Sequence, residues 1–441
     1  MLFVSMTNRL IGDYGVETDF YVAYVSQAKE LLKGNLIIDP YRGPAYQVFL
    51  AITAIITKYD YYTAGKLINV ICSGITLYFI SGIIASVLNR GGALMVVLFV
   101  AVNSVFWRYT YEPGTDMLFL AFYTSSLFLF LKSERLSYRN LLTAGILSGM
   151  AYLTRYTGIS LILFALLIFV FNMYKIGKDP SGKQRNFFKY TLAYLIPVII
   201  LASSWGMVSH IKTGHFFYNM NFQNTAQTVY KPDTMSKDEW VSKNQSSFSS
   251  MSDVIFRDFG TFTKRIAKNF STYFLKDIFR FFPKSTGILV GLGLLIFLLQ
   301  FKSVSLSEKY FFLASFIFYL QILLIFYSER FSLPLLPFYC FLIVKLFSLN
   351  FLRRFDFNIS KLKLSTLILL LLIIFNFYNS FLIAKDDINK VPVEILTVRD
   401  FINSNYGEEL SGKSIMARKP HIAYYLKMEF DVMPFAENYG E

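Results

Sequence analysis

Long apolar runs dominate this sequence and restrict the folds that it can adopt. An α-helix needs roughly 20 predominantly apolar residues to cross a bilayer. Ten runs approach or exceed that length, at about 66–88, 92–107, 114–132, 139–153, 155–174, 189–210, 286–301, 310–327, 331–349 and 364–384. The sequence therefore predicts an all-α polytopic membrane protein built as a multi-helix bundle.

The composition excludes several other classes of protein. Hydrophobic residues make up 54% and charged residues 16% of the chain, whereas ordinary soluble domains carry about 25% charge. This excludes a soluble enzyme, a disordered scaffold and a secreted disulfide module. Cys72 and Cys340 both lie inside apolar runs, so neither a disulfide framework nor a zinc site is indicated.

The net charge of +14 is distributed as membrane topology requires. Lysine and arginine gather in alternate loops, such as 175–189 and 353–363, and such loops stay in the cytoplasm. Nucleic-acid binding is not indicated. The first 65 residues, the loop 211–285 and the tail 385–441 then lie together on the outer side, provided that the short apolar run 44–57 does not cross.

The predicted outer segments contain short elements. Residues 18–34 carry apolar side chains at helical spacing and predict an amphipathic helix that Thr18 can cap and Gly34 can end. Further amphipathic helices are expected near 252–282. The tail begins as a small α/β domain, with a helix near 393–405, a strand near 413–417 and a helix near 420–427.

These elements divide the chain into a membrane domain, 1–384, and the start of an extracytoplasmic α/β domain, 385–441. The opening residues MLFVSMTNRLI are apolar enough to finish a span but too short to form one. We therefore expect a first helix to be missing, and the tail domain to be truncated.

Ionisable residues concentrate at five predicted outer turns. Such groups are costly at a membrane boundary unless they are solvated or paired, so they are candidate site residues. They are Glu17 with Asp19, Arg42, Glu112 with Asp116, Arg155, and Glu329 with Arg330.

Structural explanations exist for most of these charges. Asp19 can serve the dipole of its helix, Arg42 can extend toward the interface, and Arg330 can pair locally or with lipid headgroups. Arg155 is harder to explain in this way, because it interrupts an almost continuous apolar stretch from Leu141 to Tyr174. The sequence contains no Walker loop, no HExxH and no glycine-rich dinucleotide motif.

Five segments, taken in order, resemble the GT-C superfamily of integral-membrane glycosyltransferases. They are ETDFYVAYVSQAKELLKG, YRGPAYQVFLAI, YEPGTDMLFLAF, AGILSGMAYLTRYTGISL and ERFSLPLLPFY. The resemblance covers about residues 12–345. It is closest to the glycosyltransferase family 39-like branch, which contains protein O-mannosyltransferases and lipid A aminoarabinose transferases.

The resemblance implies a catalytic aspartate in the first outer loop, at Asp19. Many members of the superfamily have two adjacent acids there, commonly Asp-Glu, whereas here Phe20 follows the acid and Glu17 precedes it. Tyr21 and Tyr24 follow Asp19 on the helix, as in the family. Glu17 is the second candidate for the base and Asp13 is the third.

The implied reaction transfers a sugar from a polyprenyl-phosphate donor. An acceptor hydroxyl needs a base, and one carboxylate suffices for direct inversion. Guanidinium groups can stabilise the leaving phosphate, and Arg42, Arg155 and Arg330 are the candidates. Glu112, Asp116 and Tyr24 are expected to position substrate. A divalent cation remains possible, with the metal ligands unknown, and no other cofactor is predicted.

The sequence thus predicts an inverting glycosyltransferase of the prokaryotic inner membrane, with its site on the extracytoplasmic side. Its partners would be the lipid-linked sugar, membrane lipids, and a glycan, lipid or protein acceptor with a hydroxyl or amine. Three alternatives stay open. They are a transporter or flippase of lipid-linked glycans, a protein similar to O-antigen polymerases or ligases, whose arginines would lie in the 211–285 loop, and an inactive family member that acts as a scaffold.

Overall fold

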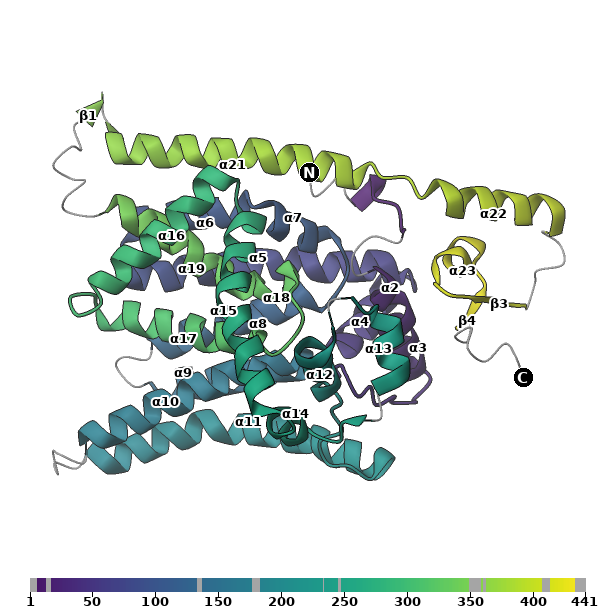
Figure 1. The fold of residues 1–441 in the computed structure, drawn as a ribbon, viewed down its shortest axis with the longest axis horizontal. Helices are drawn as coiled ribbons and strands as arrows, with labels where there is room; N and C mark the ends of the chain where they lie inside the picture. Colours follow the sequence, from purple (N-terminus) through teal and green to yellow (C-terminus); the bar gives the residue numbers. More distant parts are fainter. Residues whose placement is uncertain are drawn as a thin grey trace.

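The computed structural model shows a chain that is mostly helical (Figure 1). It describes residues 6–12, 17–132, 137–176, 183–232, 234–244, 247–348, 358–359, 362–406 and 413–432. The strands form two small sheets. One pairs β1 (Asn358–Ile359) with β2 (Leu362–Lys363), and the other pairs β3 (Ser414–Ala417) with β4 (Glu429–Val432). This confirms the predicted fold class.

The predicted amphipathic helix near the N-terminus is present, and part of it is wound more loosely than an α-helix. It consists of α2 (Glu17–Asp19), a π-helical segment (Phe20–Val25) and α3 (Ser26–Leu32). Gly34 follows with φ +87°, a conformation that glycine adopts at little cost. The predicted short apolar run forms α4 (Ala45–Ile56), a helix of 12 residues.

The remaining apolar runs form the bundle. Its first half contains α5 (Tyr61–Val87), α6 (Arg90–Ala101), α7 (Ser104–Tyr111), α8 (Thr115–Lys132), α9 (Tyr138–Thr154), a 3-10 turn (Tyr156–Gly158), α10 (Ile159–Ile176) and α11 (Lys183–Thr213). Its second half contains α16 (Lys284–Leu299), α17 (Leu306–Ile322), α18 (Glu329–Ser332), a 3-10 turn (Leu333–Leu335), α19 (Leu336–Phe347) and α21 (Leu364–Ile388).

Each predicted span coincides with a helix except 92–107, which covers both α6 and α7, and fewer of these helices are full spans by length and apolarity. Within the described residues, six are long and apolar enough to cross a membrane, or seven if α6 and α7 count as one span. These two meet at an angle of 62°, because the Asn103 side chain accepts hydrogen bonds from the Val105 and Phe106 N–H groups and starts a new helix. α16 has 16 residues, and α9 and α17 have 17 each.

The long loop and the tail also fold much as predicted. The loop contains α12 (Phe222–Tyr230), α13 (Lys237–Asn244), α14 (Met251–Phe256) and α15 (Phe259–Phe281). α15 runs steeply across the bundle (Figure 1). In the tail, α22 (Val393–Tyr406) precedes β3, α23 (His421–Leu426) and β4, and the two strands pair in parallel.

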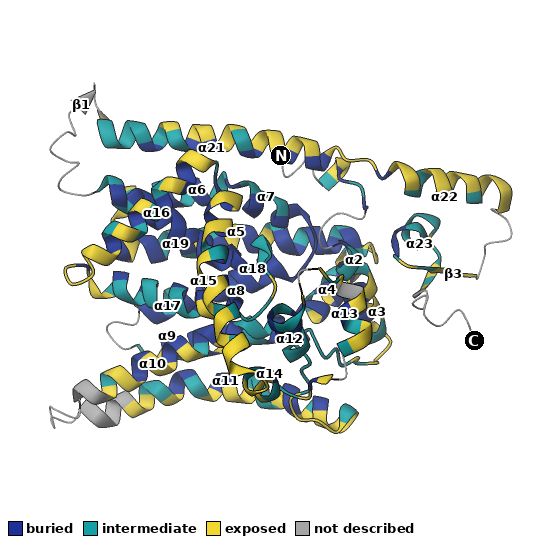
Figure 2. Cartoon of the chain, viewed as in Figure 1, coloured by how far each residue is buried: buried dark blue, intermediate teal, exposed yellow. Residues whose placement is uncertain are grey.

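Large apolar side chains cover the outside of the bundle, where Figure 2 shows exposed stretches along α10, α11 and α21. Val170 on α10, Ile200 on α11 and Ile374 on α21 are 63%, 57% and 62% exposed. An apolar surface of this extent is rare on soluble proteins. It suits the hydrocarbon region of a bilayer.

Small residues allow α9 to approach α11 closely. Gly145 lies so near α11 that an added Cβ would be 2.2 Å from the Tyr194 carbonyl oxygen. One turn later, Ser148 shares hydrogen bonds of 2.7 Å with the hydroxyls of Ser126 and Tyr194. Such small-residue contacts are typical of helix pairs in membranes. The packing against α11 therefore helps to hold α9 in place.

We predict that Gly145→Ala destabilises the bundle by about 1–3 kcal/mol, because the new methyl group forces α9 and α11 apart. Gly74→Ala is the matched control, since Gly74 lies in mid-helix and a Cβ there meets no atom within 4 Å. Thermal unfolding in detergent should show a loss for the first variant and no loss for the second. Equal effects would contradict the close packing described here.

Candidate active site

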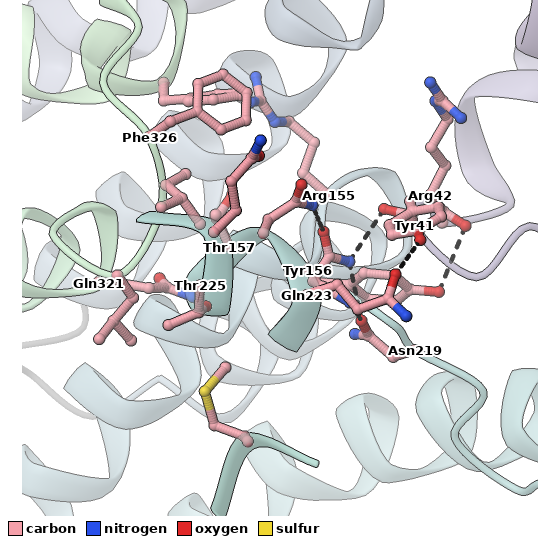
Figure 3. A pocket seen from close by; sticks show the side chains of 18 of the residues that line it. Tyr41, Arg42, Arg155, Tyr156, Thr157, Asn219, Gln223, Thr225, Gln321 and Phe326 are labelled. Carbon is pink, nitrogen blue, oxygen red and sulfur yellow. Dashed lines mark hydrogen bonds between the residues drawn. The ribbon is translucent and has the colours of Figure 1, made fainter. Parts of the chain in front are cut away.

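One cavity of about 580 Å³ gathers most of the predicted site residues. It lies between the N-terminal amphipathic helix, the break between α9 and α10, helices α12 and α13, and the segment joining α17 to α18 (Figure 3). The predicted residues that line it are Asp19, Tyr24, Arg42, Arg155 and Arg330. The sequence placed them at separate turns, and the fold brings them together.

Breaks in the helices deliver these side chains. Arg155 follows the last residue of α9 in an extended conformation, φ −146° and ψ 130°. Arg42 lies in the turn before α4, and its carbonyl oxygen accepts a hydrogen bond of 3.3 Å from the Tyr156 hydroxyl. Gly43 permits this approach, because a Cβ there would lie 2.0 Å from the Leu153 carbonyl oxygen.

Asp19 is held between two arginines. Its Oδ1 lies 3.1 Å from Arg42 Nη2, and its Oδ2 lies 3.7 Å from Arg330 Nη2. The carboxylate is nevertheless 47% exposed, so it remains accessible from the cavity. Asp39 pairs with the other terminal nitrogen of Arg42 at 3.0 Å. The sequence reasoning missed Asp39, although it is an acid in the same outer loop.

Arg155 is paired with Asp116. It also lies over the Phe331 ring, 4.8 Å from the centroid. The pair uses only Nη1 of Arg155, and within the described part of the chain no hydrogen bond engages its Nε or Nη2. Asp116 thus orients the guanidinium group and leaves N–H groups for a ligand.

The Arg42 guanidinium lies over the ring of Tyr24, 5.5 Å from its centre. Burial raises the pKa of Tyr24 above its ordinary value, so the phenol stays neutral and offers its ring face to the cation.

Glu17 and Glu112 lie elsewhere, in a buried ionic cluster centred on Arg9. Arg9 lies 3.4 Å from Glu17, 3.2 Å from Glu112 and 3.2 Å from Asp387. All four side chains are 0–3% exposed. The Tyr62 hydroxyl and the Gly12 N–H also donate to Glu17. The cluster joins the N-terminal segment to the ends of α7 and α21.

Arg108 extends the cluster to Glu329. Arg108 lies 3.4 Å from Asp387 and 3.7 Å from Glu329. Glu329 immediately precedes Arg330, and Glu17 comes two residues before Asp19. The ionic cluster therefore anchors the two segments that carry Asp19 and Arg330. This cluster could not be predicted from the sequence, because Arg9 and Asp387 are distant in the chain and neither is conspicuous alone.

Burial raises the pKa of both glutamates in the ionic cluster. It raises the pKa of Glu17 to about 7, although Arg9 and the Gly12 N–H act in the opposite direction. It raises the pKa of Glu112 to about 8 against the effect of Arg108. Both carboxyls therefore take up protons near neutral pH.

The cavity contains more arginine than carboxylate along its lining. Among the described residues, no group of three or more His, Cys, Asp or Glu side chains could hold a metal ion. Asp13, the third candidate for the base, lies outside the described residues.

Comparison with known proteins gives one family match. Residues 41–205 match the dolichyl-phosphate-mannose-protein mannosyltransferase family, a segment that includes Arg42, Glu112, Asp116 and Arg155. No curated protein sequence matches the chain.

Solved structures show the same fold at low sequence identity. ArnT from Cupriavidus metallidurans bound to undecaprenyl phosphate superposes with a TM-score of 0.61 at 10% identity, over 99% of this chain and 84% of ArnT. The oligosaccharyltransferase of Archaeoglobus fulgidus with Zn and sulfate superposes with a TM-score of 0.57 at 12% identity, over all of this chain and 57% of that one. A second structure of that enzyme, AglB with an inhibitory peptide and a dolichol-phosphate, gives 0.52 at 13% over 60% of its length.

These likenesses confirm the GT-C fold predicted from the sequence. The family match adds a sequence similarity to mannosyltransferases over residues 41–205. The predicted resemblance is therefore confirmed in fold over the bundle, and in sequence over residues 41–205.

The raised pKa of Glu112 predicts how stability depends on pH. Its folded-state pKa exceeds the ordinary value, so the folded protein binds the extra proton, and this stabilisation is lost as pH rises through about 8. We expect the free energy of unfolding to fall by up to about 1.4 kcal/mol per pH unit for one group. The unfolding temperature should therefore fall between pH 5.5 and about 8.5. Glu112→Gln should flatten this dependence.

Glu394→Gln is the matched control, because Glu394 is exposed on α22. It should keep the wild-type dependence on pH. An unchanged pH dependence in Glu112→Gln would show that the glutamate does not change its protonation there.

Proposed function

We propose that this chain is an inverting glycosyltransferase that moves a sugar from a polyprenyl-phosphate donor to an extracytoplasmic hydroxyl or amine. One observation carries the proposal. A single cavity presents one accessible carboxylate, Asp19, together with Arg42, Arg155 and Arg330. The GT-C fold and the family match support a lipid-linked donor, since a polyprenyl phosphate is bound in the ArnT structure.

Asp19 acts as the general base in this proposal. The acceptor oxygen or nitrogen attacks the anomeric carbon and gives its proton to Asp19. The bond between that carbon and the phosphate oxygen breaks, and the phosphate leaves with the electron pair. One carboxylate suffices, because no covalent intermediate between sugar and enzyme forms. The exposed position of Asp19 allows an acceptor to reach it.

Arg155 and Arg330 bind the donor phosphate. A guanidinium group can form two charge-assisted hydrogen bonds to phosphate, and these bonds strengthen as negative charge accumulates on the leaving group. Arg330 lies 3.7 Å from Asp19 and over the Phe331 ring, and Arg155 uses one nitrogen on Asp116. Both arginines can therefore turn N–H groups toward a phosphate.

Arg42 plays a different part, because both of its terminal nitrogens are engaged by carboxylates. It orients Asp19 and contributes positive charge to the phosphate end. The arginines supply the charge that the leaving phosphate requires, and no step in this proposal needs a divalent cation. Glu17 and Glu112 act indirectly, by anchoring the segments beside the cavity.

Replacing Asp19 by asparagine should abolish transfer and keep donor binding. The amide keeps the size of the side chain and cannot accept the proton, so we expect a loss of about 10²- to 10⁴-fold in turnover. The measurement is sugar transfer from a panel of labelled polyprenyl-phosphate sugars in membranes. Glu17→Gln is the matched comparison, since Glu17 lies in the ionic cluster rather than in the cavity.

Glu17→Gln should retain most of the transfer activity at 25 °C and lower the unfolding temperature. Full activity in Asp19→Asn would remove Asp19 as the base. A loss in Glu17→Gln as large as that in Asp19→Asn, in folded protein, would move the role to Glu17.

The phosphate contacts can be tested without the sugar. Arg155→Lys and Arg330→Lys keep the charge but lose the bidentate geometry, and each should weaken binding of undecaprenyl phosphate about 10-fold or more. The control is Arg90→Lys, since Arg90 is exposed at the start of α6 and does not line the cavity. Equal affinity in all three variants would place the phosphate elsewhere.

A further inference from the structure

The cavity has two chemically different regions. The charged side chains that line it are Asp19, Arg42, Arg155 and Arg330. Asp19 contacts Arg42 and Arg330, and Arg155 lies over the Phe331 ring, so these side chains form one group. The wall contributed by α12 and α13 contains no Asp, Glu, Lys or Arg among the lining residues. The cavity therefore continues from a charged region into an uncharged polar one.

Side-chain amides dominate the uncharged wall. Six of them line the cavity from the segment 219–244: Asn219, Asn221, Gln223, Asn224, Gln227 and Asn244. Amides donate and accept hydrogen bonds without carrying charge. This wall can therefore bind a ligand that both donates and accepts hydrogen bonds.

Internal hydrogen bonds hold the wall in a fixed arrangement. The Tyr41 hydroxyl donates to Gln223 Oε1. Asn221 Nδ2 donates to the Tyr41 carbonyl oxygen at 3.1 Å and to Asn219 Oδ1 at 2.8 Å. Figure 3 shows Tyr41, Asn219 and Gln223 grouped on one side of the cavity. The bonds tie α12 to the loop that carries Arg42, so the amides keep a defined position relative to the charged region.

Gln321 lies at the end of α17, apart from that group in Figure 3. It lines the cavity, and its Oε1 is buried without a hydrogen-bond partner in the described part of the protein. A buried polar atom without a partner costs about 1–3 kcal/mol. Such an atom in a cavity wall indicates a missing hydrogen-bond donor, which a bound ligand can supply.

Aromatic side chains complete the lining. Phe326 is 42% exposed in the cavity and contacts Phe331 edge-on at 5.3 Å. Tyr152 and Tyr156 line the cavity near the α9 break, with ring centroids 5.5 Å apart. Flat aromatic faces beside fixed hydrogen-bonding groups suit the C–H face and the hydroxyl edge of a pyranose ring.

We infer that the amide-lined wall is a subsite for a neutral saccharide, and that the acceptor is an uncharged glycan. This inference rests on the proposed function, which assigns the arginines to the donor phosphate. A polyhydroxylated ring uses both donors and acceptors, as the amides do. A phosphorylated glycolipid would need cations at this wall, and none of the described lysine or arginine side chains lines it. An extended peptide could also pair with these amides and with Gln321 Oε1, and the experiment below distinguishes it from a saccharide.

Binding of neutral sugars to the purified chain tests the inference. The probes are disaccharides of glucose, mannose, galactose, N-acetylglucosamine and rhamnose, measured by saturation-transfer NMR with undecaprenyl phosphate present. The detergent must lack a sugar headgroup, because a maltoside would compete for the subsite. We expect at least one disaccharide to bind, and Gln321→Leu to weaken its binding about 5- to 20-fold.

Gln321→Leu should fold normally, because it removes an unpartnered buried oxygen. The matched control is Gln300→Leu, which changes an exposed glutamine at the end of α16 and should leave sugar binding unchanged. Unchanged binding of undecaprenyl phosphate in Gln321→Leu separates this inference from the proposed function, which fails if the wild type does not bind that lipid.

Three results would overturn the inference: no binding of any neutral disaccharide, equal binding by the wild type and Gln321→Leu, or binding only of diphosphorylated lipid A or of a serine- and threonine-rich peptide. The last of these would assign the wall to a charged lipid or a protein acceptor.

Discussion

The ionic cluster around Arg9 fixes the frame on which the site depends. Its buried guanidinium needs carboxyl partners that accept its hydrogen bonds and supply compensating charge, because an unpaired charge in a low-dielectric interior is strongly destabilising. Those partners come from three separate segments: Glu17, Glu112 and Asp387. Arg108 extends the cluster to Glu329. Asp19 and Arg330 follow closely in sequence after Glu17 and Glu329, so the cluster limits where the proposed base and a phosphate-binding arginine can lie.

The ion pair between Asp19 and Arg42 in the cavity is more exposed to solvent than the pairs of the ionic cluster. Asp19 is paired at 3.1 Å and 3.7 Å and is half exposed, whereas Arg9 and its partners are buried. This contrast separates two uses of ion pairs in one molecule. Buried pairs hold segments together, and in the proposed function the partly solvated pairs exchange partners when a phosphate binds. The amide wall adds fixed hydrogen-bonding groups without adding charge.

The sequence predicted much of this arrangement for a clear physical reason. A charge at the end of an apolar run is costly unless it has a use, and this reasoning identified Asp19, Arg42, Arg155 and Arg330, all of which line one cavity. The same reasoning could not separate Asp19 from Glu17. That distinction depends on Arg9 and Asp387, which lie 378 positions apart in the chain.

Other features left too weak a mark in the sequence to be predicted. The break between α6 and α7 depends on one asparagine cap inside an apolar run, so hydropathy merged the two helices into one span. The amide wall carries no charge, and asparagine and glutamine in a long polar loop resemble ordinary solvated residues. Only the fold shows that Gln321, almost a hundred residues further on, lines the same cavity as α12.

The position of a bound polyprenyl phosphate tests the central claim most directly. An electron cryo-microscopy structure of the full chain with undecaprenyl phosphate would locate the phosphorus atom. Our account predicts a phosphate within hydrogen-bonding distance of Arg155 and Arg330, with Asp19 facing the same space. A phosphate bound elsewhere, for example in the shallow hollow beside Lys276 and Arg280 on α15, would contradict it.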